Sequence, residues 1–260
     1  MKYHIKRYAF TLAEILITLG VIGIVAAMTM PSLIQNHQVK STVSRLKKVN
    51  SVLNQAYLFI RQNDGEFQDW YTGDAPNFLF YEYEYNIQGL EKFAKYMKPV
   101  KLCTSGTSCN PSGTKYLSGN KCHVLDSNYP SMELPDGTII YYANYFSDCG
   151  TSVGQLHERL CGYIYVDING KTKPNTIGKD VFCFHMAKNN IVPCGIEGDP
   201  QKPFSPADDI YSGNDACTLT NGGGGCTAWV LHNENMDYLK CADKLSWDGN
   251  KTCNEGSSDK

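Results

Sequence analysis

The hydrophobic pattern of the chain changes at Pro31. Apolar side chains fill most positions from Phe10 to Met30. In a helix that rises about 1.5 Å per residue, about 21 residues span roughly 31 Å, the hydrocarbon thickness of a bilayer. The sequence therefore predicts a membrane-spanning helix over residues 10–31. Because Pro31 lacks an N–H group, we expect a kink or a break in the helix near it.

After Pro31 the apolar residues recur every three or four positions, with polar residues between them. They are Val39, Val43, Leu46, Val49, Leu53, Ala56 and Ile60. This spacing predicts an amphipathic helix over residues 32–62 with one apolar stripe. We expect the stripe to cover a sheet of the same chain, the alternative being a coiled coil with another chain. Residues 62–65 include Asn, Asp and Gly, which favour turns, so the helix should end there.

For the rest of the chain, the sequence predicts a globular head over residues 63–260 that consists mainly of β-structure. Predicted strands cover residues 131–134, 138–142, 163–167, 180–186 and 191–193. A short helix capped by Asn86 is expected before Pro99, and another over residues 227–239. The fold class is therefore α+β: a long N-terminal helix packed on an antiparallel sheet of about four strands, with C-terminal extensions. The aromatic stretch over residues 63–85 is interpreted as a connecting segment, the alternative being a carbohydrate-stacking site.

One charged residue, Glu14, lies within the apolar run. A carboxylate in lipid costs at least about 2.5–3.5 kcal/mol on insertion scales, so it implies a function and a partner. A free amine four residues away would be such a partner, and it would exist if the chain were cut between Ala9 and Phe10.

The start of the chain resembles the prepilin signature of type IV pilins and type II secretion pseudopilins. The resemblance rests on the basic leader of residues 1–9, the run Phe10-Thr11-Leu12-Ala13-Glu14 and the apolar helix that follows. That family usually has Gly before the cut, whereas this chain has Ala9. The signature covers only about a tenth of the chain. The pilin head is also a helix followed by an antiparallel sheet.

The resemblance implies a processing and assembly pathway. A prepilin peptidase would cleave the bond between Ala9 and Phe10 and N-methylate Phe10. Glu14 would then pair with the amine of a neighbouring subunit as an inner-membrane platform draws subunits from the lipid bilayer into a filament. The implied protein is a single-pass inner-membrane subunit, major or minor, with its head outside the cytoplasm. The alternatives are a tip-located minor pilin that binds a surface, sugar or DNA, and a membrane-tethered secreted protein that does not assemble.

Two simpler interpretations of the N-terminal stretch remain open. A secretory signal peptide also has a basic start and an apolar core, and Val25-Ala26-Ala27 could form its cleavage site. An ordinary membrane anchor is the second. Glu14 and the continuation of the helical pattern beyond residue 27 argue against the signal peptide.

All eleven cysteines lie at or after Cys103. Because they include no C-x-x-C pair and no zinc-finger spacing, they indicate disulfide bonds and hence an oxidising compartment. The odd number means that at least one thiol is free or pairs with another chain. The connectivity cannot be read from the sequence.

Calcium is the one cofactor that the sequence leaves open. Asp167, Asn169, Asn175 and Asp180 could supply oxygen ligands, and some pseudopilins bind calcium in the head. However, the twelfth position of an EF-hand would be Gly178, so that motif fails. The alternative is a long turn in which Asn and Asp side chains bond the backbone, with Gly170 and Gly178 at positive φ.

Nothing in the composition or motifs indicates catalysis or nucleic-acid binding. The net charge is −2, which gives no electrostatic basis for binding nucleic acid. The six histidines are scattered, and neither a Gly-x-Ser-x-Gly nor a His-Glu-x-x-His motif is present. We expect a structural protein rather than an enzyme.

Overall fold

The computed structural model describes most of the chain in two compact units. The described residues are 11–71, 82–104, 109, 113–122, 125, 129–144, 147, 149, 151–152, 159–195, 217, 219–220 and 222–254. The units are Met1–Ser41 and Thr42–Lys260. Helix α1 (Leu12–Asp64) begins in the first unit and ends in the second.

In the first unit, α1 is apolar and its side chains are exposed. Its large apolar residues from Leu12 to Ile34 are between 46% and 76% exposed. The helix continues through Pro31, so the expectation of a break there is wrong. A proline removes only one backbone hydrogen bond, and the bonds on either side hold a long helix together.

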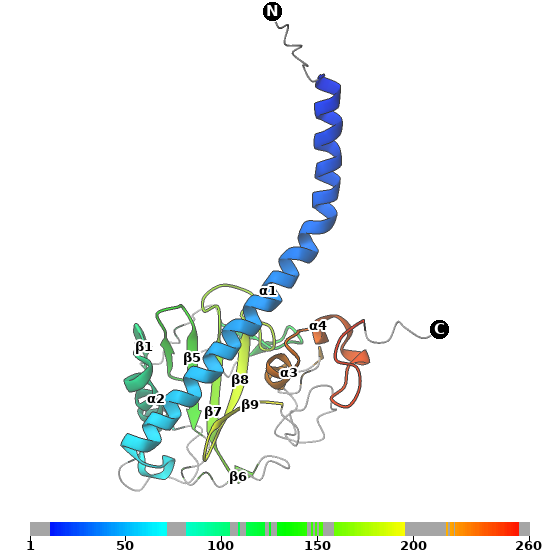
Figure 1. The fold of residues 1–260 in the computed structure, drawn as a ribbon. Coiled ribbons are helices and arrows are strands. Elements are labelled where there is room, and N and C mark those ends of the chain that lie inside the picture. The colour runs from blue at the N-terminus through cyan, green and yellow to red at the C-terminus, as the bar shows by residue number, and fades with distance from the viewer. Residues whose placement is uncertain are drawn as a thin grey trace, which may run out of the picture. The chain divides into compact units, whose positions relative to one another are not determined.

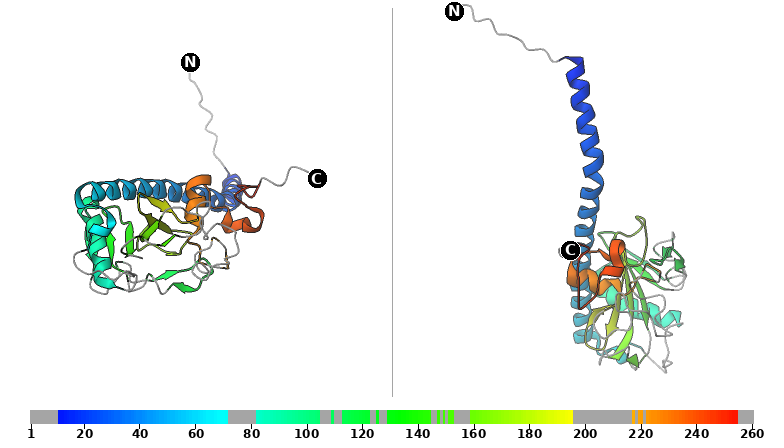
Figure 2. Two further views of the ribbon diagram at one scale, coloured as in Figure 1. Left: turned by 90° about the horizontal axis from the view of Figure 1, so that it is seen from below. Right: turned by 90° about the vertical axis from the view of Figure 1, so that its right-hand side faces the viewer.

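In the second unit, α1 buries the predicted stripe against the sheet. Its buried residues are Val43, Leu46, Val49, Leu53, Ala56, Tyr57 and Ile60. Figure 2 shows this part of α1 lying along one face of the sheet. The Asn54 amide also exchanges two 3.0 Å hydrogen bonds with the backbone of Ile191 at the sheet edge. The prediction that the stripe covers the chain's own sheet is therefore confirmed.

The sheet of the second unit is antiparallel and larger than expected (Figure 1). Its strand order is β1 (Lys101–Cys103), β4 (Ser131–Glu133), β5 (Ile139–Asn144), β7 (Arg159–Asp167), β8 (Val181–Ala187) and β9 (Ile191–Pro193), and β6 (Thr151–Ser152) also pairs with β7. A separate hairpin consists of β2 (Thr114–Lys115) and β3 (Lys121–Cys122). The prediction of about four strands was too low because β1 and β6 are too short to show an alternating pattern.

Both faces of the sheet are covered, which explains why β5 and β8 are buried at every described position. On one face, Tyr142 of β5 packs against Phe93 of α2 (Tyr83–Met97). On the other face, Tyr141 belongs to a buried cluster with Cys103 and Cys122. Successive side chains of a strand point to opposite faces, so an apolar run without alternation marks a strand buried on both sides.

Helix α2 covers the sheet at close range. A Cβ on Gly89 would lie 2.3 Å from the Tyr142 ring, so only glycine permits this approach. Asn86 was expected to cap this helix, but the helix begins at Tyr83 and the Asn86 side chain accepts a 2.7 Å bond from the Asn144 backbone. The cap prediction was wrong because a buried strand amide recruits the Asn86 side chain.

The C-terminal segment forms two helices where one was expected. Helix α3 (Cys226–Asn233) ends at Glu234, whose φ of 54° is left-handed, and α4 (Tyr238–Cys241) follows. The short 3-10 helix η2 (Ala242–Lys244) follows α4, and a similar one, η1 (Phe67–Asp69), follows α1. The Thr227 hydroxyl accepts a 3.0 Å bond from the Cys183 backbone, which joins α3 to β8.

Two leucines of α1 provide a matched test of this packing. Leu53 is fully buried, whereas Leu58 is 53% exposed. Leu53→Ala should lower the free energy of unfolding by about 2–5 kcal/mol because it leaves a cavity under the helix. Leu58→Ala should change it by at most about 0.5 kcal/mol. Chemical denaturation of the detergent-solubilised chain with its disulfides intact measures both, and equal effects would contradict the packing described.

Candidate functional site

Glu14, which the sequence analysis singled out, forms a capping box with Thr11 at the start of α1. Thr11 precedes the helix, and its backbone N–H and hydroxyl both donate to Oε2 of Glu14 at 2.8 Å. The Glu14 N–H donates in return to Thr11 Oγ1 at 3.2 Å. These bonds satisfy donors that a helix start leaves without intrahelical partners. The spacing Thr-x-x-Glu before an apolar run was the signal in the sequence that would have revealed Thr11.

Glu14 is the one charged residue between Phe10 and Met30. Within the described part of the chain, α1 is a helix long and apolar enough to cross a membrane, by length and composition. The proposed cleavage site, Ala9 and Phe10, lies outside the described residues.

The four calcium candidates do lie together, in the turn between β7 and β8. The Asp180 carboxylate accepts bonds from the backbone N–H groups of Asn175 at 2.9 Å and Thr176 at 2.6 Å, and from the Asn169 amide at 3.2 Å. Asp167 accepts a 3.2 Å bond from the Asn169 N–H. These carboxylates therefore already bind donors of the turn itself.

The alternative of a long turn is confirmed by the backbone. Gly170 and Gly178 have φ values of 63° and 79°. Burial raises the pKa of the Asp180 carboxyl, and the hydrogen bonds from Thr176, Asn175 and Asn169 oppose that rise. No group of three or more His, Cys, Asp or Glu side chains suited to a metal occurs among the described residues.

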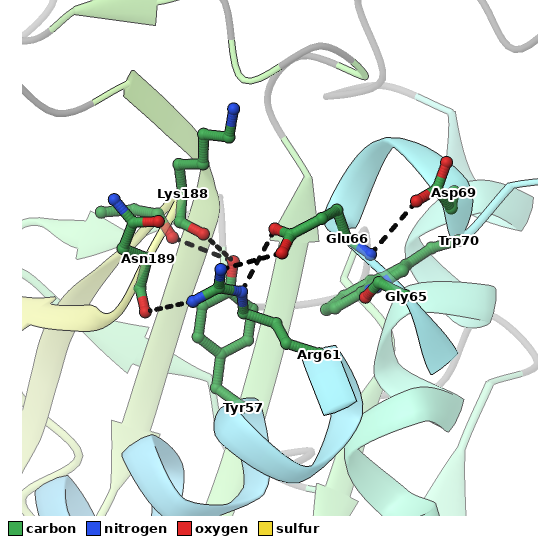
Figure 3. Close-up of polar contacts among 9 residues, drawn as sticks. Tyr57, Arg61, Gly65, Glu66, Asp69, Trp70, Lys188 and Asn189 are labelled. Carbon is green, nitrogen blue, oxygen red and sulfur yellow. Dashed lines mark hydrogen bonds and ion pairs between the residues drawn. The ribbon is translucent and has the colours of Figure 1, made fainter. Parts of the chain in front are cut away.

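A polar cluster that was not predicted from the sequence attaches the C-terminal end of α1 to the head (Figure 3). Arg61 makes a two-pronged contact with Glu66, at 2.8 and 3.2 Å, and donates a 3.0 Å bond to the Asn189 carbonyl. The Tyr57 hydroxyl donates to the carbonyls of Ala187 and Lys188 at 2.9 and 3.2 Å. These contacts attach α1 to the turn between β8 and β9, and their role is structural.

The packing of two aromatic rings near this cluster bears on the alternative of a carbohydrate-stacking site. Trp70 and Tyr71 are only 4% and 7% exposed, so neither presents an open ring face. Trp70 packs edge-on to Phe93, and Tyr71 donates a 2.7 Å bond to Asn144. These rings pack on the head, as expected of a connecting segment, while residues 72–81 lie outside the described residues.

A small apolar hollow of about 210 Å³ lies beside α1. It is lined by Val49, Val52, Met97, Leu134 and Pro135, together with Lys48 and Asp136. Lys48 and Asp136 form an ion pair at 2.7 Å. The lining suits an apolar side chain rather than a sugar, since almost no polar atom faces the space.

Five disulfides join ten of the eleven cysteines. The pairs are Cys103–Cys109, Cys149–Cys161, Cys183–Cys194, Cys217–Cys226 and Cys241–Cys253. Each pair is 6 to 12 residues apart in the sequence. The eleventh cysteine, Cys122, is buried in the cluster that contains Cys103 and Cys109. The expectation of a disulfide-rich head is confirmed, and the pairing could be assigned only from the structure.

The comparisons with known proteins identify a family. Residues 32–235 match the model of a family of unknown function, DUF6613. The chain belongs to this family. The matched region begins after the apolar run and includes the sheet of the second unit. No curated protein matches the chain, and neither does any solved structure.

Asp64, the last residue of α1, gives a prediction of how the stability of the fold depends on pH. The hydrogen bond from Lys95 lowers the pKa of the Asp64 carboxyl below its ordinary value of 3.8, and Tyr96 and Lys92 contribute. A lowered folded-state pKa stabilises the fold above that ordinary value, and the contribution is lost as the pH falls through the lowered pKa. Asp64→Asn should thus cost about 1 kcal/mol at neutral pH and reduce the loss of stability on acidification below pH 3.8.

The matched control is Asp243→Asn, because Asp243 is exposed and forms no ion pair with any described residue. Unfolding curves between neutral pH and strong acid compare the three proteins. Parallel pH profiles for all three would contradict the role assigned to Asp64.

Proposed function

We propose that this protein is a prepilin-like filament subunit, processed by a prepilin peptidase and assembled through its apolar N-terminal helix. The observation that carries the proposal is the placement of Glu14. It is the one charged residue between Phe10 and Met30, where the large apolar side chains of α1 are exposed, and it lies in the first turn of the helix. Cleavage between Ala9 and Phe10 would place a cationic N-terminus four residues from it.

The placement of Glu14 determines which interaction would favour assembly. In a bilayer the apolar side chains of α1 are already satisfied by lipid, so their burial in a helix bundle gains little from the hydrophobic effect. A salt bridge between Glu14 and the Phe10 amine of another copy would supply a specific favourable term. Removal of one partner from such a buried pair costs about 3–5 kcal/mol.

The disulfides support an extracytoplasmic location for the head. Disulfides form and persist in oxidising compartments, and the second unit contains all five pairs. An apolar N-terminal helix with a disulfide-bonded head beyond it fits an inner-membrane filament subunit. The partners on this proposal are the peptidase, the assembly platform, lipid and further subunits.

Mass spectrometry of the mature N-terminus tests the processing step. In a host with its own prepilin peptidase, the chain should begin with N-methylated Phe10. In a matched host without the peptidase, it should retain Met1. A chain that begins near Met28 in both hosts would contradict the proposal and favour a secreted protein, and one that retains Met1 in both would favour a simple anchor.

A charge-removing variant tests the assembly step. Glu14→Gln keeps the size of the side chain and an oxygen that can accept from Thr11, but it removes the charge. It should lower recovery in sheared filaments about a hundredfold or more, since about 3 kcal/mol corresponds to that factor, with the amount in the membrane unchanged. Thr18→Val is the control, because among the described residues the Thr18 hydroxyl bonds only to the carbonyl of Ile15 in its own helix. Normal incorporation of Glu14→Gln would refute the salt-bridge role.

A further inference from the structure

We propose that Asn250 is an acceptor for N-linked glycosylation, in which a membrane-bound transferase attaches an oligosaccharide to its side-chain amide. Asn250-Lys251-Thr252 has the acceptor pattern Asn-x-Ser/Thr, in which the middle residue is not Pro. The other Asn-x-Ser/Thr of the chain, at residues 110–112, has Pro in the middle and is excluded. The inference shares with the proposed function only the extracytoplasmic location of the head, which the disulfides support.

The acceptor lies in an exposed loop near the end of the described chain. Residues 245–254 follow η2 and contain neither helix nor strand. Asn250 is exposed and Thr252 is partly exposed, so both side chains of the pattern lie at the surface. Asp248, two residues before Asn250, is exposed as well and adds a carboxylate that a transferase can recognise by its charge. A bulky, polar glycan fits such a surface loop and could not fit a packed core.

In the described part of the chain, this loop is held by backbone contacts, by Lys251 and by a disulfide. The contact of Asn250 uses its backbone carbonyl, which accepts a 3.2 Å bond from the Ser246 N–H. The Lys251 ammonium group donates to the Ser246 carbonyl at 3.1 Å. The disulfide between Cys241 and Cys253 closes the loop. Replacement of an exposed side chain such as that of Asn250 should therefore leave the loop folded.

The linkage would form by a group transfer whose co-reactant is an oligosaccharide joined through a diphosphate to a membrane lipid. Nδ2 of Asn250 forms a bond to the anomeric carbon of the first sugar and loses one proton. The bond from that carbon to the diphosphate oxygen breaks, and the lipid diphosphate leaves with the electron pair. No oxidant or reductant takes part. The Thr252 hydroxyl, which can both donate and accept a hydrogen bond, is the group by which the transferase recognises the acceptor.

Mass spectrometry tests the inference on the full chain, purified from membranes of the cells that naturally produce it. Trypsin cuts after Lys244 and Lys251, so Asn250 and Asn254 fall in different peptides, residues 245–251 and 252–260. The peptide with Asn250 should carry the added mass of an oligosaccharide, and its fragmentation should release sugar ions and place the added mass on Asn250. A peptide without added mass would overturn the inference.

Three variants test whether the modification depends on the acceptor pattern. Thr252→Ala removes the hydroxyl but keeps Asn250, and it should abolish the added mass. Thr252→Ser keeps the hydroxyl and should retain the added mass. Asn254→Gln is the matched control, because Asn254 is also exposed but has Gly256 two positions later, and it should leave the modification unchanged. Added mass that persists in Thr252→Ala, or that is lost in Thr252→Ser, would overturn the inference.

The same samples report on the fold and on the proposed function. Unreduced digests should show the disulfide between Cys241 and Cys253 in every variant, so that loss of the sugar reports loss of the acceptor rather than of the loop. The N-terminal peptide separates the two proposals. A chain that begins with N-methylated Phe10 but lacks the sugar overturns only the present inference. A glycosylated chain that still begins with Met1 supports the present inference and contradicts the processing step.

Discussion

The structure of the head depends on burying both faces of one antiparallel sheet. Helices α1 and α2 cover one face, where Tyr142 meets Phe93, and the cluster around Cys103, Cys122 and Tyr141 covers the other. Burial of a sheet on two sides excludes water from its backbone, so each strand must find its hydrogen bonds within the sheet. The short edge strands β1 and β9 complete these bonds at either end of the sheet.

Polar side chains at the edge of this core join neighbouring segments through hydrogen bonds. Asn54 bonds both backbone groups of Ile191, Tyr57 and Arg61 bond the turn after β8, and Asp180 bonds the turn before it. The bond from Arg61 to Asn189 is exposed. The contacts of Asn54, Tyr57 and Asp180 satisfy buried or half-buried donors or acceptors that would otherwise cost free energy. The grouped oxygens of the Asp180 turn thereby have a structural explanation that needs no bound ion.

The first unit obeys a different constraint, because its apolar side chains are exposed within the chain itself. Glu14 is the one charged residue between Phe10 and Met30, within the helix that is long and apolar enough to cross a membrane by length and composition. The capping box with Thr11 shows how a single hydroxyl and a backbone N–H can engage a carboxylate at that position.

Local sequence patterns were sufficient to predict the apolar run, the stripe from Val43 to Ile60, the strands β4 and β5 and the positive φ of Gly170 and Gly178. These features depend on neighbours within a few residues, so a single sequence contains them. The disulfide pairs, the strands β1 and β6, the role of Asn86 and the contacts of Arg61 with Asn189 required the tertiary structure. They are decided by contacts that become known only when the strand order is known, since one polar side chain has many candidate partners until the fold selects one.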